Sequence, residues 1–405
     1  MRADVVVIGA GALGLSTALQ AARLGRDVMV IERHTAGSQA SGRAAGLFKS
    51  VQADALRTEL ARRSIDLAVG FAGWAGVPLD VVRSGSFLVA RTAEHQALLR
   101  REARQSTGWG ADVSEVRAQD LAGRLSYYHG DGGEHVLWCP EDAYIEEPGS
   151  LVRGYVAACE RLGVQILEGE QVVGVTVSGG RVTGVETDRR SVRTGVAVDA
   201  AGAWTRQVAE LAGARVAVAP VRHQLLITEP SAAVDPAGPI CRVVDAAVYL
   251  RPARGGLMVG GFEADPLPLD PRAEPASFST DDLPLDLTVL RKLAGQVEAE
   301  VPLATGAAVA EHRGGLFTMS PDGRFVAGPV PEVPGLWIAS GCNGSGFSSS
   351  PAIGEALAGW ICGRDDRLRI DPLAPARFGR LTDEALISDG IWQYAHYYDP
   401  AAVDA

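Results

Sequence analysis

The first 34 residues of the chain combine two short apolar runs with a longer stretch whose apolar residues recur at helical spacing. Residues 5–8 are continuously apolar, which is typical of a strand that is buried on both faces. From Leu13 to Leu24 the apolar positions follow the period of a helix, and residues 27–31 form a second strand-like run after Gly25. This order predicts a strand, a helix and a second, parallel strand.

Two segments far downstream show a similar pattern. Residues 193–205 are predicted to form a strand that ends in Ala-Ala-Gly before a helix. Residues 335–363 are predicted to form a buried strand, a loop of Gly, Ser and Asn, and a helix that begins at Pro351, because proline is favoured in the first turn of a helix. After its first pass through the N-terminal domain, the chain is therefore predicted to return to that domain twice.

Between these segments the pattern changes to short strands with hairpin signals. Gly-containing turns at 178–180 and 254–256 separate runs rich in β-branched residues, which indicates two β-hairpins. Residues 221–228 and 241–262 are predicted to be strands of a mixed sheet. A second domain of this kind is expected beside the first.

Length and composition narrow the class of protein. A chain of 405 residues is too long for one ordinary core, and 47% hydrophobic with 21% charged residues is typical of globular proteins. The net charge of −11 would repel phosphate backbones, so we expect no nucleic-acid partner. No apolar run reaches the roughly 18 residues of a membrane helix, so we expect no membrane association. The five scattered cysteines argue against a metal site and fit a cytoplasmic location.

The turn between the first strand and helix contains Gly9, Gly11 and Gly14 in the spacing GxGxxG. The first glycine allows a tight turn, the second lets a pyrophosphate approach the backbone, and the third lets the helix pack closely on the strand. The helix N-terminus favours an anion. Glu32, at the end of the second strand, is placed to hold ribose hydroxyls. These features predict a dinucleotide site and do not by themselves separate FAD from NAD.

The loop that follows, residues 35–50, is rich in small and hydroxyl-bearing residues. Its N–H groups and hydroxyls suit the second phosphate and the ribityl side of a long cofactor, although a solvated linker would have a similar composition. Together with the two downstream returns of the chain, the loop favours FAD.

Five stretches of the chain, in this order, resemble the FAD-dependent amino acid and amine oxidoreductases of the D-amino acid oxidase class: GSQASGRAAGL, DAAGAWTRQVAELAG, PVRHQLLITEP, YLRPARGGLMVGGFE and GCNGSGFSSSPAIGEALAGWICG. The chain is most similar to the dimethylglycine dehydrogenase and sarcosine oxidase branch. The resemblance implies non-covalent FAD, because Arg43 and Gly315 stand where members of that branch carry a flavin-linked histidine or cysteine. The folate-binding half of full-length dimethylglycine dehydrogenases, and one-carbon transfer to folate, are not expected.

The predicted fold class is α/β (α+β overall), with a Rossmann-type FAD-binding domain and a mixed-sheet substrate domain that covers the flavin. Because the chain returns to its first domain, that domain is discontinuous. The predicted ranges are 1–76, 150–214 and 326–370 for the FAD-binding domain, 77–149 and 215–325 for the substrate domain, and 371–405 for a C-terminal tail.

The motifs and the resemblance together predict which residues bind FAD. They lie in the glycine turn, after the second strand, in the 35–50 loop, in the backbone that faces adenine, and in the two downstream returns. They are Gly9, Gly11, Ala12, Leu13, Gly14, Glu32, Arg33, Ser38, Ser41, Arg43, Ala44, Ala45, Gly46, Leu47, Val172, Val173, Ala201, Gly202, Trp204, Gly341, Asn343, Gly344, Ser345, Gly346, Phe347 and Ser348.

Two residues of the substrate domain are predicted to be catalytic. His223 matches a histidine that lies beside the substrate in dimethylglycine-oxidising relatives, and a core histidine is the alternative. Tyr249 matches an active-site tyrosine of that branch, and a core aromatic is the alternative. Because an unperturbed imidazole has a pKa of about 6.5, we predict that His223 acts as the base toward the amine.

Lys49 is the third predicted catalytic residue, since sarcosine oxidases have a basic residue near that place that binds the substrate carboxylate; a solvated lysine is the alternative. Their second carboxylate-binding lysine is replaced by Ser348, which makes sarcosine itself doubtful as a substrate. Their lysine over the flavin is replaced by Met258, which predicts a slow reaction with oxygen.

The expected function is FAD-dependent oxidation of the C–N bond of a secondary or tertiary amino acid or related amine, by hydride transfer to flavin N5 and hydrolysis of the imine. The electron acceptor is oxygen or another compound. One alternative is a glycine or D-amino acid oxidase that acts on a primary amine. Another is the FAD-binding β-like subunit of a heteromeric sarcosine oxidase or amino acid dehydrogenase, which would need a partner subunit. An NAD-dependent dehydrogenase is the remaining alternative.

Overall fold

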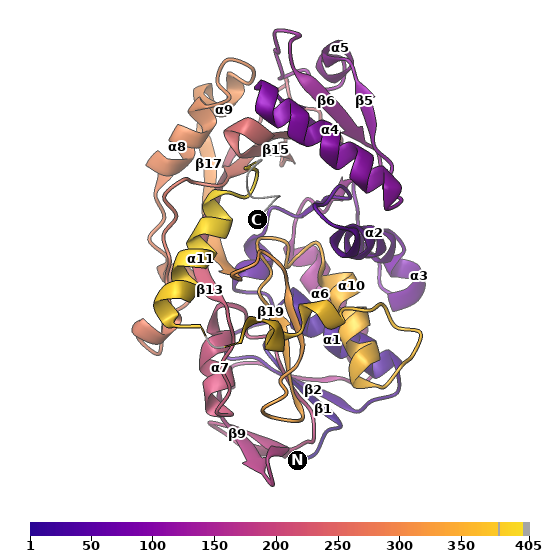
Figure 1. Ribbon diagram of the computed structural model, residues 1–405, viewed down its shortest axis with the longest axis vertical. Helices are drawn as coiled ribbons and strands as arrows, with labels where there is room; N and C mark the ends of the chain where they lie inside the picture. Colours follow the sequence, from indigo (N-terminus) through magenta and orange to yellow (C-terminus); the bar gives the residue numbers. More distant parts are fainter. Residues whose placement is uncertain (380, 400–405) are drawn as a thin grey trace.

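The structure, a computed structural model, describes residues 1–379 and 381–399. Two large sheets form its frame, one in the half of the molecule near the N-terminus and one in the opposite half (Figure 1). The arrangement confirms the predicted α/β class with a mixed sheet in the second part. In the described part of the chain, no helix is both long and apolar enough to cross a bilayer.

The first sheet has six strands in the order β18-β19-β12-β1-β2-β8. All neighbours are parallel except β18, which runs antiparallel to β19. The strands are β1 (Val5–Ile8), β2 (Val28–Ile31), β8 (Gln165–Leu167), β12 (Ala197–Asp199), β18 (Val326–Pro329) and β19 (Leu336–Ser340). They come from three separated stretches of the chain, as the two downstream returns predicted.

Both faces of this sheet are covered, which explains why β1 is apolar at every position. Val5 and Val7 belong to one core cluster, and Val6 and Ile8 belong to another on the opposite face. The helices on the first face are α1 (Ala12–Arg23), α2 (Ala55–Val69), α3 (Phe71–Ala75), α6 (Gly149–Arg161) and α10 (Ser350–Ile361). The other face is covered by α7 (Thr205–Leu211) and an antiparallel sheet of β9 (Val172–Ser178), β10 (Arg181–Thr187) and β11 (Ser191–Arg193).

The second sheet has eight strands in the order β17-β13-β16-β15-β14-β4-β6-β5. It is mixed, because β4 and β14 are parallel whereas the other neighbours are antiparallel. The strands are β4 (Ser86–Ala90), β5 (Ser114–Val116), β6 (His135–Cys139), β13 (Ala219–Thr228), β14 (Ile240–Val243), β15 (Val248–Ala253), β16 (Gly256–Gly261) and β17 (Val309–Met319). The accompanying helices are α4 (Ala93–Gly108), α5 (Ala118–Ala122), α8 (Leu287–Gly295) and α9 (Leu303–Gly306).

Strand β13 is buried along its whole length. It pairs with β16 on one edge and β17 on the other, and α11 (Asp383–Ala395) lies beside it (Figure 1). Helix α11 comes from the predicted C-terminal tail; residues 380 and 400–405 of that tail lie outside the described residues. A short pair, β3 (Leu47–Phe48) with β7 (Ala143–Tyr144), joins the loop after α1 and β2 to the second part of the molecule.

Candidate active site

A cavity of about 590 Å³ lies at the carboxyl ends of β1, β2 and β12, where open parallel sheets bind their ligands. It passes the glycine turn, the end of β2 and the start of β9. The predicted cofactor residues that line it are Gly9, Gly11, Ala12, Leu13, Glu32, Arg33, Ser41, Ala44, Val172, Val173, Ala201, Gly202, Trp204, Gly344, Gly346 and Phe347.

A smaller cavity of about 100 Å³ continues from one end of the first. The two share walls, which are made by Ala40, Ala44, Phe317, Gly344 and Phe347. The other predicted residues that line the smaller cavity are Arg43, Ala45, Gly46, Leu47, Lys49, His223, Tyr249, Ser345 and Ser348. The three predicted catalytic residues therefore meet in one cavity, next to the loop predicted to hold the flavin.

Gly14 lines neither cavity, but it sets the distance between β1 and α1. A Cβ at this position would lie 2.0 Å from the carbonyl oxygen of Gly9 and 3.1 Å from the Cβ of Ala200. The first turn of α1 carries no acidic residue, and the backbone N–H of Ala12 donates to Oγ of Ser41 at 3.0 Å. The 35–50 loop therefore closes over a helix N-terminus that favours an anion.

Glu32 has a structural task in addition to its predicted one. Its Oε2 accepts from the backbone N–H of Ala10 at 2.8 Å, and its Oε1 accepts from the N–H of His34 at 2.8 Å. The carboxylate thus ties the glycine turn to the end of β2. Each oxygen retains acceptor capacity, and the residue lines the larger cavity, which suits a ribose with two hydroxyl donors.

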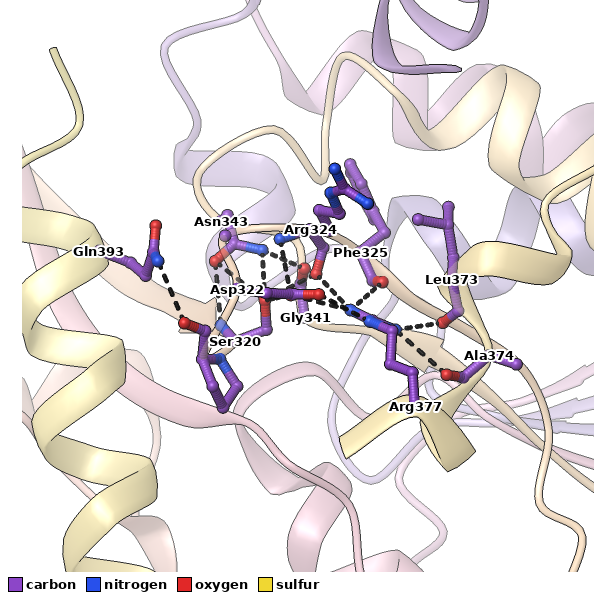
Figure 2. Close-up of polar contacts among 12 residues, drawn as sticks. Ser320, Asp322, Arg324, Phe325, Gly341, Asn343, Leu373, Ala374, Arg377 and Gln393 are labelled. Atoms are coloured by element: carbon purple, nitrogen blue, oxygen red, sulfur yellow. Dashed lines mark hydrogen bonds and ion pairs between the residues drawn. The ribbon is translucent and has the colours of Figure 1, made fainter. Parts of the chain in front are cut away.

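Three other residues predicted to bind the cofactor lie outside both cavities, namely Ser38, Gly341 and Asn343. Asn343 instead holds the loop before α10: its Nδ2 donates to the carbonyl of Gly341 at 2.7 Å, and its Oδ1 accepts from the N–H of Ser320 at 2.9 Å (Figure 2). The carbonyl of Ser38 accepts from Nε of Arg43 at 3.3 Å. These residues shape the binding loops, a role that motif matching does not separate from direct contact.

The same network anchors the C-terminal segment (Figure 2). Arg377 forms an ion pair with Asp322 through Nε at 2.8 Å and donates from Nη2 to the carbonyl of Phe325 at 2.8 Å. Nε2 of Gln393, on α11, donates to the carbonyl of Pro321 at 3.0 Å. Helix α11 is thereby held against the turn that follows β17.

His223 lies between two tyrosine hydroxyls. Its Nδ1 is 2.7 Å from Oη of Tyr394 and its Nε2 is 2.9 Å from Oη of Tyr249. The ring of Phe317 stacks on the imidazole, with centroids 4.1 Å apart and an interplanar angle of 16°. A neutral imidazole has one N–H and one lone pair, so one tyrosine donates to it and the other accepts from it. We call Tyr394, His223 and Tyr249 the tyrosine–histidine chain.

The protonation state of His223 differs from the prediction. Burial lowers its pKa to about 3 instead of the expected 6.5, because the charged imidazolium would lose its hydration in this position. Burial also raises the pKa of Tyr249 and of Tyr394. All three side chains are therefore neutral at physiological pH, and His223 is a hydrogen-bonding group rather than a strong base in this cavity.

Gly260 makes room for Tyr249. The two residues are cross-strand partners on β15 and β16, and a Cβ at position 260 would lie 2.2 Å from the Tyr249 hydroxyl oxygen. The glycine lets the phenol lie across the neighbouring strand and reach His223. In the sequence, this glycine stands within the stretch YLRPARGGLMVGGFE, which carries the family resemblance but does not show what the glycine packs against.

Five aromatic residues in or next to the smaller cavity were not predicted from the sequence: Phe262, Phe317, Tyr394, Tyr397 and Tyr398. Four of them line the cavity directly, and Tyr394 closes the tyrosine–histidine chain behind His223. The rings of Phe262 and Tyr397 stack with centroids 3.9 Å apart. The signal available in the sequence was the cluster of one Trp and three Tyr within 392–398, in a chain with only 6% aromatic residues.

The smaller cavity is also lined by four cationic side chains and, within residues 1–379 and 381–399, by no Asp or Glu: Arg43, Lys49, Arg242 and Arg313. Arg242 and Arg313 were not predicted. The described residues contain no group of His, Cys, Asp and Glu that could hold a metal ion.

Met258 does not face the site, contrary to the prediction. Its side chain is fully buried with Leu225, Ile227 and Ala253, packs against Ala45, and lines neither cavity. Because its residue type then says nothing about charge at the reacting atoms, the inference of a slow reaction with oxygen loses its basis.

The residues of the two cavities fit FAD. The larger cavity offers free N–H groups at the start of α1 and an acidic ribose partner in Glu32. Where the two cavities meet, residues 44 and 344 and the rings of Phe317 and Phe347 line both of them. An extended dinucleotide whose aromatic ring system ends at this junction would leave the smaller cavity to the substrate.

Comparison with known proteins agrees with this assignment. Residues 4–360 match the family described as "DAO: FAD dependent oxidoreductase", and the chain belongs to this family. The family is one of FAD-dependent oxidoreductases, and the proteins similar to this chain include amine and amino acid oxidases and dehydrogenases. The resemblance found in the sequence is confirmed, and the family favours FAD over NAD as the cofactor.

Similar proteins include 4-methylaminobutanoate oxidase (formaldehyde-forming) of Paenarthrobacter nicotinovorans, 30% identical over 88% of this chain and 43% of that protein. Mitochondrial sarcosine dehydrogenase of Mus musculus is 26% identical over 89% and 39%. The chain therefore spans about two fifths of these relatives. Glycine oxidase of Pseudomonas aeruginosa is 28% identical over 94% of this chain and its whole length. L-proline dehydrogenase from P. horikoshii, a solved structure at 22% identity, superposes with a TM-score of 0.84 over 94% and 99% of the two chains.

Proposed function

We propose that the protein oxidises the carbon–nitrogen bond of a secondary or tertiary amino acid or related amine, with FAD as the hydride acceptor and hydrolysis of the imine as the last step. The observation that carries this proposal is the meeting of Lys49, His223 and Tyr249 in the cavity that continues from the dinucleotide site. The names of two relatives, 4-methylaminobutanoate oxidase and sarcosine dehydrogenase, support the substrate class.

The tyrosine–histidine chain orients the amine in this proposal. If Tyr249 donates its hydroxyl proton to Nε2 of His223, its oxygen is left to accept the N–H of a secondary amine, a bond that a neutral tertiary amine does not form, and Nδ1–H of His223 donates to Tyr394. A neutral chain of this kind binds the unprotonated amine, which has the lone pair that hydride loss requires. The aromatic rings around it exclude water from the reacting carbon.

Lys49 binds the carboxylate of the substrate in this proposal. Among the described residues no carboxylate pairs with its ammonium group, which lies 5.6 Å from the ring centroid of Tyr398. A cavity of about 100 Å³ suits a small substrate.

The substrate proposal is tested with purified holoenzyme and an amine panel, with flavin bleaching under anaerobic conditions as the readout. We expect N-methylated amino acids to reduce the flavin faster than glycine, D-alanine or L-proline. Reduction only by primary amines would contradict the proposal in favour of a glycine oxidase type of reaction, which the full-length match to glycine oxidase keeps as the second candidate. No reduction by any member of the panel would favour the need for a partner subunit.

We also propose that FAD is bound without a covalent link. Arg43 forms an ion pair with Asp281, and position 315 carries no side chain, so neither predicted point of attachment offers a nucleophile. Acid or detergent denaturation is expected to release all of the flavin into the supernatant, measured by its absorbance. Yellow colour that stays with the precipitated protein would contradict this.

A further inference from the structure

Arg242 is a buried cation that neither the sequence motifs nor the proposed reaction explains. It lies on β14, is 3% exposed, and lines the smaller cavity. Its Nη1 donates to Oδ2 of Asp142 at 3.0 Å and to Oγ of Ser86 at 3.0 Å. In the described part of the chain its Nε and Nη2 have no hydrogen-bond partner. The guanidinium is thus fixed on one side and keeps donors for another ligand.

Asp142 holds this cation in a prepared position. Its carboxylate is fully buried, and the oxygen that does not contact Arg242 accepts from the N–H of Ser50 at 2.7 Å and from its Oγ at 2.6 Å. Burying such a pair costs more solvation free energy than forming a surface pair, so little stability is gained if the pair only joins β14 to the turn between β6 and β7. It is instead typical of a site in which a charged group is held rigidly for a ligand.

The same carboxylate brings a second cation to this wall. Ser50, which is bonded to Asp142, directly follows Lys49, and Lys49 has no acidic partner among the described residues. Tyr398 covers Lys49 and lines the cavity together with Arg242. Lys49 and Arg242 therefore occupy one region of a cavity whose described lining contains no acidic side chain, in a protein with a net charge of −11.

We propose that Arg242 and Lys49 form a two-cation site for a carboxylate of the substrate, with Arg242 as the residue that selects amino acids over uncharged amines. This rests on the proposed function and narrows it. Arg242 presents planar N–H donors that suit a carboxylate, and Lys49 adds a point charge. Asp142 is a positioning residue, since it touches Arg242 and not the cavity.

The test separates ligand binding from turnover. Acetate and its uncharged counterpart acetamide are titrated into the FAD-loaded enzyme, and the change in flavin absorbance gives the dissociation constants. The wild-type enzyme is expected to bind acetate and to discriminate against acetamide. The variant Arg242→Met with Asp142→Asn removes both charges, so no unpaired charge is left buried, and it is expected to bind acetate about 10- to 100-fold more weakly while it retains its flavin.

The matched control is Arg91→Met with Asp245→Asn. This ion pair, with Nε of Arg91 2.8 Å from Oδ2 of Asp245, joins the segments that follow β4 and β14 and lines neither cavity. Arg91 also pairs with Glu300, whose side chain is 14% exposed and keeps contact with water in the control variant. The control is expected to bind acetate like the wild type. Unchanged acetate affinity in the Arg242 variant, or no discrimination between acetate and acetamide by the wild type, would overturn the site.

A second variant tests the site in case the double variant does not fold. Arg242→Lys keeps the charge but cannot bond Asp142 and present a planar pair of donors at once, so acetate binding is expected to fall about tenfold. Wild-type affinity in this variant would also overturn the proposal. If acetate binding depends on Arg242 while no amine reduces the flavin, the carboxylate site stands and the proposed function fails. The opposite result, amine oxidation without dependence on Arg242, rejects only this site.

Discussion

Replacing Tyr249 by Phe is expected to lower the rate of flavin reduction by about tenfold or more while the protein keeps its flavin. The substitution removes the hydroxyl that lies 2.9 Å from Nε2 of His223 and faces the substrate cavity. A secondary amine then loses the acceptor for its N–H, and with it the hydrogen bond that orients its lone pair. The measurement is anaerobic stopped-flow reduction by the best substrate of the panel. Tyr394→Phe, which removes the other end of the chain, is expected to have a smaller effect.

The control for this experiment is Tyr155→Phe. Tyr155 is also a buried tyrosine, its hydroxyl lies 3.2 Å from Oγ of Ser350, and it lines neither cavity. The Tyr155→Phe variant is expected to lose about 1 kcal/mol of stability, and the substrate is expected to reduce its flavin at the wild-type rate. Equal reduction rates for Tyr249→Phe and wild type would return Tyr249 to the role of a core aromatic. His223→Ala is less informative, because it leaves two buried hydroxyls without a partner, at about 1–3 kcal/mol each.

The dependence of the flavin reduction rate on pH tests the protonation state of His223. Because burial lowers the pKa of His223 to about 3, its protonated form is rare at any pH used for kinetics. The reduction rate at low substrate concentration is therefore expected to rise with pH as the fraction of unprotonated amine rises, without a step near pH 6.5. A step near pH 6.5 that disappears in Tyr249→Phe would show that substrate and flavin restore a basic imidazole.

Replacing Gly14 by Ala is expected to prevent stable flavin binding, with an affinity loss of about 100-fold or more and a lower thermal midpoint. The added Cβ would lie 2.0 Å from the carbonyl oxygen of Gly9. The oxygen is part of the backbone and the Cβ is bonded directly to it, so a change of side-chain rotamer cannot separate them. Helix α1 must move from β1, and the N–H groups at its start move with it. The measurement is flavin content after purification and FAD titration of the apoprotein.

Gly73→Ala is the matched control, because Gly73 lies in helix α3 and an added Cβ would meet no atom within 4 Å apart from its chain neighbours and the backbone of its own helix. Alanine is favoured over glycine in a helix by about 1 kcal/mol, so this variant is expected to be as stable as the wild type or more so. The same preference acts in favour of alanine at position 14. Full flavin content and an unchanged midpoint in Gly14→Ala would therefore show that the strand and helix are less tightly coupled than their geometry indicates.

Much of the fold was predictable because its signals are local. The apolar run of β1, the helical period of α1 and the glycine spacing between them lie within 34 residues, and each follows from the local geometry of strand, helix or turn. The resemblance added the order of the later segments, and it placed His223, Tyr249 and Lys49 in one cavity. Motif matching was less able to separate direct contact from support: Gly341 and Asn343 shape the loop before α10 and lie outside both cavities.

The sequence by itself determined that this chain forms a parallel sheet around a glycine turn for a dinucleotide, and which loops lie at the flavin end. Only the tertiary structure decided the chemistry of the smaller cavity. Tyr394 is 171 residues from His223, and Arg242 is 100 residues from the Asp142 that holds it. The pKa of His223 depends on burial by those distant partners. Periodicity reports which face of an element is buried, whereas a hydrogen bond or a desolvated charge depends on which distant side chain arrives at that face.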